Sequence, residues 1–95
     1  MTEKDQYIQK AKARIDQWDA EIKKMKAQVE EAEADKKIEY QKELDEMRAK
    51  RDEAQAKLDE LRDAGDDAWQ DMKGGFEQAW TNISSAFERA KSRFK

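Results

Sequence analysis

The side chains that could do chemistry in this chain are carboxylates, lysines, tyrosines and hydroxyls. The 95 residues include no Cys and no His. This excludes disulfides, thiol nucleophiles, imidazole or thiolate metal sites, Ser-His triads and the usual proton shuttle near neutral pH. The remaining residue types form no recognisable pair of nucleophile and base. We therefore expect no catalytic residue, no cofactor, no metal site and no enzymatic activity.

The densest group of potential ligands is acidic and consists of Asp63, Asp66, Asp67 and Asp71. These carboxylates could form a weak cation site, but calcium loops need oxygen ligands at alternating positions around a sharp Gly turn, and that pattern is missing. Helix capping explains them better. Gly65 can end one helix in the left-handed conformation, and the two aspartates that follow can cap the next. We expect a structural junction here, with Gly65 as a hinge.

Gly74 and Gly75 are the second group of residues with a possible chemical role, which would be phosphate binding. A phosphate-binding loop would need a Gly-rich fingerprint after a strand, and neither is present. Two adjacent glycines cost about 2 kcal/mol relative to alanines in a helix interior. We therefore expect either a hinge here or a close approach of the backbone to another group.

The elements that position these residues are predicted to be helices. Charged residues make up 45% of the chain and apolar residues 37%, with three Gly and no Pro, which is typical of long helices and coiled coils. The net charge is −3, with acids and bases mixed along the chain, so nothing draws it toward nucleic acid. The first residues are charged and apolar runs are short, so we expect neither a secretory signal nor a membrane span, and a cytoplasmic location.

A narrow apolar stripe organises residues 8–32. Its members recur with gaps of alternately three and four residues, which is typical of a coiled coil. We call this stripe the seam, and its members are Ile8, Ala11, Ile15, Trp18, Ile22, Met25, Val29 and Ala32. So narrow a stripe cannot be buried on a lone helix, and it must face a partner helix from the same chain or another. We expect the helix to begin at Glu3, after a Thr2 cap, and the chain to form a homo-oligomer through the seam.

Around residues 33–37 the apolar pattern slips by an eleven-residue step, from Val29 to Tyr40. Either the coil unwinds locally within one helix, or the chain turns and makes three helices of similar length. Residues 30–40 lack Gly, Pro, Asn and Ser, and Glu33 with Lys37 is a favourable pair one turn apart. We therefore expect one helix over residues 3–63, about 90 Å long. A three-helix bundle that turns near residues 33–37 is the alternative.

After Gly65 the chain becomes aromatic, and a broad apolar stripe with helical spacing begins. We call it the aromatic face, and it comprises Trp69, Met72, Phe76, Trp80, Ile83, Phe87 and Phe94. The same segment ends in a basic tail that comprises Arg89, Lys91, Arg93 and Lys95. We expect a helix near residues 66–94 that folds back on the first as a helical hairpin. Its aromatic face either packs on the second half of the first helix, where Lys37 and Arg51 interrupt the stripe, or lies on an anionic membrane.

Three segments carry a resemblance to a known family. They are Ile-Asp-Gln-Trp-Asp-Ala-Glu-Ile at 15–22, Ala-Lys-Arg-Asp-Glu-Ala-Gln-Ala-Lys-Leu at 49–58 and Asp-Asp-Ala-Trp-Gln-Asp-Met-Lys at 66–73. With the charged start and the aromatic tail, they resemble the small bacterial coiled-coil-domain proteins often labelled stress-response proteins. The resemblance implies a bacterial, non-enzymatic helical protein, and it transfers no catalytic residue.

The sequence thus predicts an all-α protein with a charged coiled-coil helix in residues 1–64 and an aromatic amphipathic segment in residues 65–95. As a function we expect a non-enzymatic scaffold or interaction protein, related to stress by the resemblance, which associates with its own copies through the seam and binds a protein partner. The alternative is a peripheral protein whose amphipathic helix binds an anionic membrane or a hydrophobic granule surface.

Overall fold

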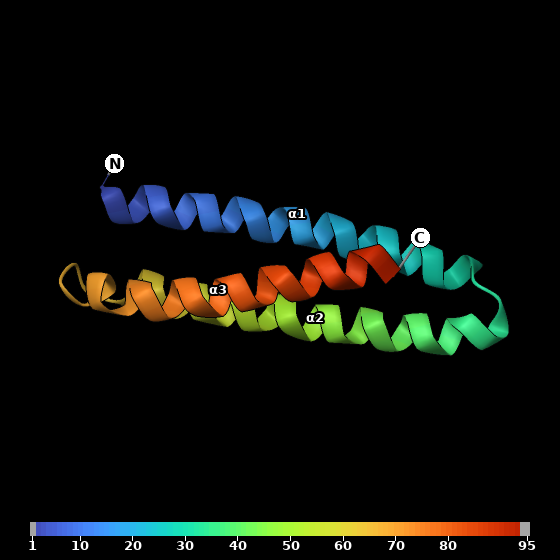
Figure 1. Ribbon diagram of the computed structural model, residues 1–95. Coiled ribbons are helices and arrows are strands. Elements are labelled where there is room, and N and C mark those ends of the chain that lie inside the picture. The colour runs from blue at the N-terminus through green and yellow to red at the C-terminus, as the bar shows by residue number, and fades with distance from the viewer. Residues whose placement is uncertain (1, 94–95) are drawn as a thin grey trace.

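Three helices lie along one axis and alternate in direction. The structure is a computed structural model that describes residues 2–93, with α1 at Glu3–Glu31, α2 at Ala34–Asp63 and α3 at Ala68–Arg93. Figure 1 shows that α2 returns antiparallel to α1 and that α3 runs in the same direction as α1. The bundle measures 52 × 21 × 18 Å along its principal axes. The all-α prediction is therefore confirmed.

The start of α1 follows the sequence signal. The Asp5 backbone N–H donates to the Thr2 Oγ1 at 3.1 Å, so the Thr2 side chain satisfies one of the free donors of the first turn. Glu3 and Asp5 lie in that turn, where carboxylates face the positive end of the helix dipole. The prediction that the helix begins at Glu3 is confirmed.

The prediction of one helix over residues 3–63 is wrong, because the chain turns at Ala32 and Glu33. Ala32 has φ −72° and ψ 151°, and Glu33 has φ −66° and ψ 156°, so both are extended. The three-helix alternative is correct, with its turn at Ala32 and Glu33, at the start of residues 33–37. The physical reason is burial: a straight helix would leave two narrow apolar stripes in water, whereas a two-residue turn lets them cover each other.

One core draws on all three helices. Its buried members are Ala11, Ile15, Trp18, Ile22, Met25 and Val29 from α1, Leu44, Met47, Ala54, Leu58 and Leu61 from α2, and Trp69, Phe76, Ile83, Phe87 and Ala90 from α3. Ile8, Tyr7, Tyr40 and Trp80 are half-buried against it. The seam is therefore the α1 side of a core within one chain.

The junction between α2 and α3 differs from the capping prediction. α2 ends at Asp63, and its C-cap is Ala64 in an extended conformation. Gly65 does not have a positive φ, so it is not the left-handed cap that the sequence predicted. The Trp69 N–H donates to the Gly65 carbonyl at 3.0 Å, and the Lys4 ammonium donates to the Ala64 carbonyl. The junction is thus fixed to the start of α1 by a charged side chain.

α3 continues without interruption through Gly74 and Gly75. A Cβ added at either position would find no heavy atom within 4 Å. The prediction that the backbone approaches another group here is therefore wrong, and no packing requirement explains the two glycines. A hinge at this position remains a prediction.

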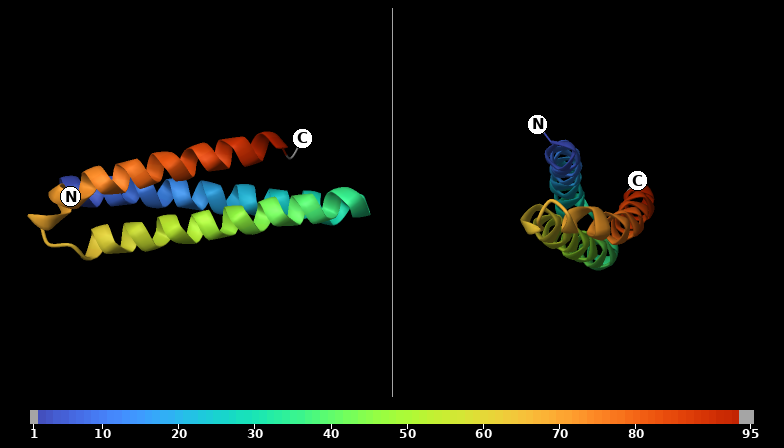
Figure 2. Two further views of the ribbon diagram at one scale, coloured as in Figure 1. Left: turned by 60° about the horizontal axis from the view of Figure 1, so that its bottom comes forward. Right: turned by 90° about the vertical axis from the view of Figure 1, so that its left-hand side faces the viewer.

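The α1–α2 hairpin extends past the end of α3. Arg93, the last residue of α3, is bound to Glu43, which lies nine residues after the start of α2. At about 1.5 Å per residue, the remaining hairpin is about 14 Å long. We call residues 30–40 the arm, and Figure 2 shows it projecting beyond the described end of α3. Residues 33–39 of the arm are all exposed, and Ile38 is 78% exposed.

Candidate interaction surfaces

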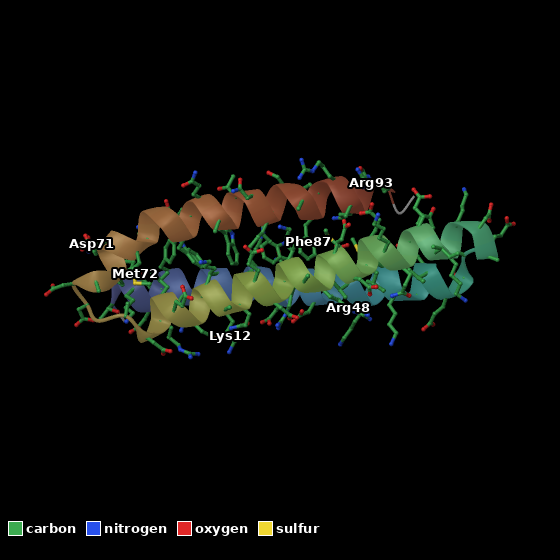
Figure 3. All side chains as sticks on the ribbon, turned by 90° about the horizontal axis from the view of Figure 1, so that it is seen from below. Lys12, Arg48, Asp71, Met72, Phe87 and Arg93 are labelled. Atoms are coloured by element: carbon green, nitrogen blue, oxygen red, sulfur yellow. The ribbon has the colours of Figure 1, made fainter. Side chains whose placement is uncertain are left out.

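Aromatic rings fill the space between α1 and α3. Trp18 stacks on Phe87 with ring centroids 4.8 Å apart and an interplanar angle of 11°. The ring centroid of Trp80 lies 4.7 Å from that of Trp18. Phe76 continues the column with its centroid 5.2 Å from that of Trp80. Figure 3 shows Phe87 directed from α3 toward the other two helices, while Lys12 and Arg48 extend on the far side of the bundle. Large side chains thus join α1 to α3.

Tyr7 anchors the other end of the column, although sequence analysis did not single it out. Its ring lies 6.1 Å from Trp69 and 5.8 Å from Phe76, and its hydroxyl donates to the Glu77 Oε1 at 3.1 Å. Burial, followed by the hydrogen bond to Glu77 and the negative charge of Glu77, raises the pKa of Tyr7 to about 12. Its position one residue before Ile8 and four before Ala11 was the available signal, because it places Tyr7 at the edge of the seam within the same helical turn.

The aromatic face lies in the core. Trp69, Phe76, Ile83 and Phe87 are buried and Trp80 is half-buried. Met72 is 38% exposed, and Phe94 lies outside the described residues. The alternative in which this face packs within the protein is therefore the one observed, with the difference that it covers α1 as well as α2.

Ion pairs connect the helices along the rim of the core. Arg51 binds Asp19 with two hydrogen bonds, at 2.7 Å from Nε to Oδ1 and 3.1 Å from Nη2 to Oδ2. The hydrogen bond to Asp19 raises the pKa of Arg51 above its ordinary value. By its sequence position, Arg51 only interrupts the apolar stripe of α2. The structure instead places its charge at the core edge, where a carboxylate of α1 neutralises it.

The basic tail is bound to acids of the other two helices. The Lys91 Nζ lies 3.4 Å from the Glu21 Oε1, and Arg93 donates to Glu43. Arg89 lines an open groove between α2 and α3, and Lys95 lies outside the described residues. Both α1 and α2 therefore hold the end of α3 through exposed or partly exposed pairs, which salt screens.

One groove exposes the edge of the aromatic column. It lies between α1 and α3, has a volume of ≈ 240 Å³, and is lined by Tyr7, Lys10, Ala11, Arg14, Phe76 and Trp80. Two basic side chains of α1 thus flank the half-buried indole of Trp80. This combination of cations beside a partly exposed tryptophan is the most distinctive surface on the described part of the bundle.

The acidic residues of the junction are not gathered as a set of metal ligands in the described part of the chain. Among residues 2–93, no group of three or more acidic side chains is arranged to hold a metal ion. The weak cation site considered for Asp63, Asp66, Asp67 and Asp71 therefore gains no support.

None of the three helices, as described over residues 2–93, has an apolar stretch of the length that a membrane span needs.

Comparisons with protein-family models, with curated proteins and with solved structures find no match to this chain.

Proposed function

We propose that the protein is a non-enzymatic helical interaction protein that associates with its own copies through the seam and presents its charged helix faces to a protein partner. The observation that carries the proposal is the position of the seam. It supplies the α1 side of the core from Ala11 to Val29, and α1 connects directly to α2 only through the two residues Ala32 and Glu33.

This position gives the seam two ways to be buried. Within one chain, it packs against α2 and α3, as observed. Between chains, the same stripe can pack against the α2 and α3 of another copy, because the core contacts depend on the sequence of the helices and not on the turn that connects them. Self-association through the seam therefore requires α1 to leave its own bundle.

The surface of the closed bundle supports the same conclusion. Ile38 and Met72 are the exposed large apolar side chains on the described residues, and single exposed apolar residues do not make an interface. A constitutive dimer of closed bundles thus has little apolar area to bury. The resemblance to stress-response proteins adds the proposal that conditions which loosen the bundle favour association.

The experiment is a concentration series from micromolar to millimolar, with the mass measured by light scattering after chromatography. Samples are unfolded in urea and refolded at each concentration, so that slow opening does not hide the equilibrium. We expect a monomer of 11.2 kDa at low concentration and a dimer at high concentration. A monomer at every concentration would refute self-association.

We propose a second function, peripheral binding to an anionic membrane, on the basis of a specific observation in α3. Gly74 and Gly75 weaken the first third of this helix with no packing reason, and the half-buried Trp80 lies in a groove beside Lys10 and Arg14. Opening at the glycines would release the aromatic face toward lipid while Arg89 and the paired cations of the tail turn to headgroups.

Flotation with vesicles of phosphatidylserine and phosphatidylcholine tests this second function. We expect the protein to float with these vesicles at low salt and to remain in the dense fraction with pure phosphatidylcholine. The double variant Gly74→Ala, Gly75→Ala keeps the whole aromatic face but strengthens α3, so it should bind less if opening is required. Absence of flotation at low salt would leave the aromatic face with a packing role alone.

A further inference from the structure

The turn between α1 and α2 is built from residues that favour a helix. Residues 30–40 contain no Gly, Pro, Asn or Ser. The two turn residues have negative φ, and only their ψ angles near 150° separate them from the helical conformation. A change of ψ at two adjacent residues therefore converts the hairpin into one straight helix, with no left-handed residue to prevent it.

The charges at the end of α1 favour the straight form. Glu30 and Glu31 lie in the last turn of α1, which contains no basic residue, so they face the negative end of its dipole. Lys36 and Lys37 lie near the positive start of α2, where Asp35 in the first turn offsets them. In a continuous helix both dipole ends disappear, while Glu33 and Lys37 stay one turn apart, as they already are in α2, where the Lys37 N–H donates to the Glu33 carbonyl at 2.8 Å.

The start of α2 is also only partly capped. Its N-cap residue is Glu33, whose side chain makes no capping hydrogen bond. The Lys36 N–H is instead satisfied by the Glu33 carbonyl and the Asp35 carboxylate, both at 3.0 Å. Because α3 ends level with Glu43, it lies too far along the bundle for its described residues to cover the turn. Packing from α3 thus does not hold the turn closed.

From these observations we propose that two copies of this chain form a dimer by exchanging α1. In each copy, Ala32 and Glu33 become helical, and residues 3–63 form one helix. The α1 part of that helix packs on α2 and α3 of the other copy, with the core contacts and the Asp19–Arg51 ion pair now made between chains. This inference rests on the proposed self-association and specifies how the buried seam takes part in it.

Geometry makes the exchange reciprocal. Two long helices cross at their turn residues in an antiparallel arrangement, and each end of the dimer contains a complete three-helix bundle. A helix of residues 3–63 is about 90 Å long, whereas the closed chain extends 52 Å. An exchanged dimer is thus much longer than the closed chain, and also longer than a dimer of two closed bundles that pack side by side.

A pair of charge variants tests the exchange directly. Asp19→Arg alone places two cations together in the closed chain, and Arg51→Asp alone places two anions together. In an exchanged dimer between the two variants, each reversed residue faces an opposite charge, and both pairs are restored. After joint unfolding and refolding, we expect the mixed dimer to form at about tenfold lower concentration than either variant alone. Native mass spectrometry identifies it, and a random mixture, in which the mixed dimers only equal the two uniform dimers combined, would overturn the exchange.

Glu33→Pro supplies an independent test that leaves the core untouched. Proline requires a φ near −65° and an extended residue before it, and both conditions are met by Glu33 and Ala32. A proline in the middle of a straight helix, by contrast, is strongly unfavourable. We expect this variant to fold as a monomer and to lower the dimer association constant by about a hundredfold or more. Glu33→Ala removes the same charge and should retain the dimer.

The outcomes separate this inference from the function on which it rests. If the chain is monomeric at every concentration, both are wrong. If a dimer forms that Glu33→Pro does not weaken, and X-ray scattering gives it a maximum dimension well below about 90 Å, self-association stands and the exchange is refuted. An elongated dimer that Glu33→Pro abolishes supports both.

Discussion

The indole of Trp18 lies flat against the ring of Phe87, with centroids 4.8 Å apart and planes within 11° of parallel. This contact joins the first and last helices of the bundle, whose backbones are otherwise held apart by large side chains. Both residues are buried, Trp18 to 5% exposure and Phe87 to 3%. The stability of the bundle is therefore expected to depend on this pair more than on any exposed ion pair.

Trp18→Ala should lower the free energy of unfolding by about 3–5 kcal/mol, because it removes a buried indole and leaves a cavity beside Trp80 and Phe87. The measurement is urea unfolding followed by circular dichroism at 222 nm, which does not depend on the lost fluorophore. Trp18→Phe keeps a ring at the position and should cost less. A loss below about 1 kcal/mol for Trp18→Ala would mean that the column is not packed as described.

Ile22→Asp should unfold the monomer, because the seam lies in the core of a single chain and the new carboxylate would lose its water there. We expect a loss of about 4 kcal/mol or more, a large part of the stability of a small domain. Ile38→Asp is the matched control, since Ile38 is 78% exposed, and it should change stability by about 0.5 kcal/mol at most. A folded Ile22→Asp monomer would show that the seam is not part of the intrachain core.

Replacing the two helix-interior glycines should stabilise α3. Gly74→Ala and Gly75→Ala add a methyl group to open space, so each should raise the free energy of unfolding by about 0.8–1 kcal/mol. Gly65→Ala also meets no atoms, but Gly65 lies outside the helices and should gain less. Thermal unfolding of the four proteins gives the comparison. Destabilisation by either helix variant would indicate a contact or a bend that is missing from this structure.

Tyr7 should make stability depend on alkaline pH. Its pKa is raised from 10.0 to about 12 in the folded chain, so folding favours the neutral phenol. This contribution is fully present below about pH 10 and is lost as the pH rises toward 12. Titration by absorbance at 295 nm should show one phenol that ionises late, and Tyr7→Phe should remove it together with this part of the pH dependence. An unchanged titration in Tyr7→Phe would assign the late phenol elsewhere.

The sequence was informative where side-chain pattern alone decides the structure. The spacing of the seam identified the buried side of α1 from Ala11 to Val29 before any partner was known, and Thr2 located its start. The aromatic face was found in the same way. Such patterns are read reliably because any partner helix buries the same stripe.

The sequence offered the turn at Ala32 and Glu33 only as the alternative to a continuous helix, because no residue there requires a turn. Local preference favours a continuous helix, and only the burial of two distant stripes against each other outweighs it. The role of Arg51 was missed for a related reason. Its partner, Asp19, lies 32 positions away, and this pairing exists only after the chain has folded back.

The position of α3 on a surface made by both other helices has a consequence during synthesis. Ribosomes add about 5–20 residues per second, so the roughly 30 residues that follow α2 take about 2–6 s to appear. A helical hairpin forms in far less time, which leaves Trp18 without Phe87 for most of that interval. The unfinished hairpin is then the form in which α1 has the fewest contacts to break, so newly made chains, more than finished ones, are expected to exchange it.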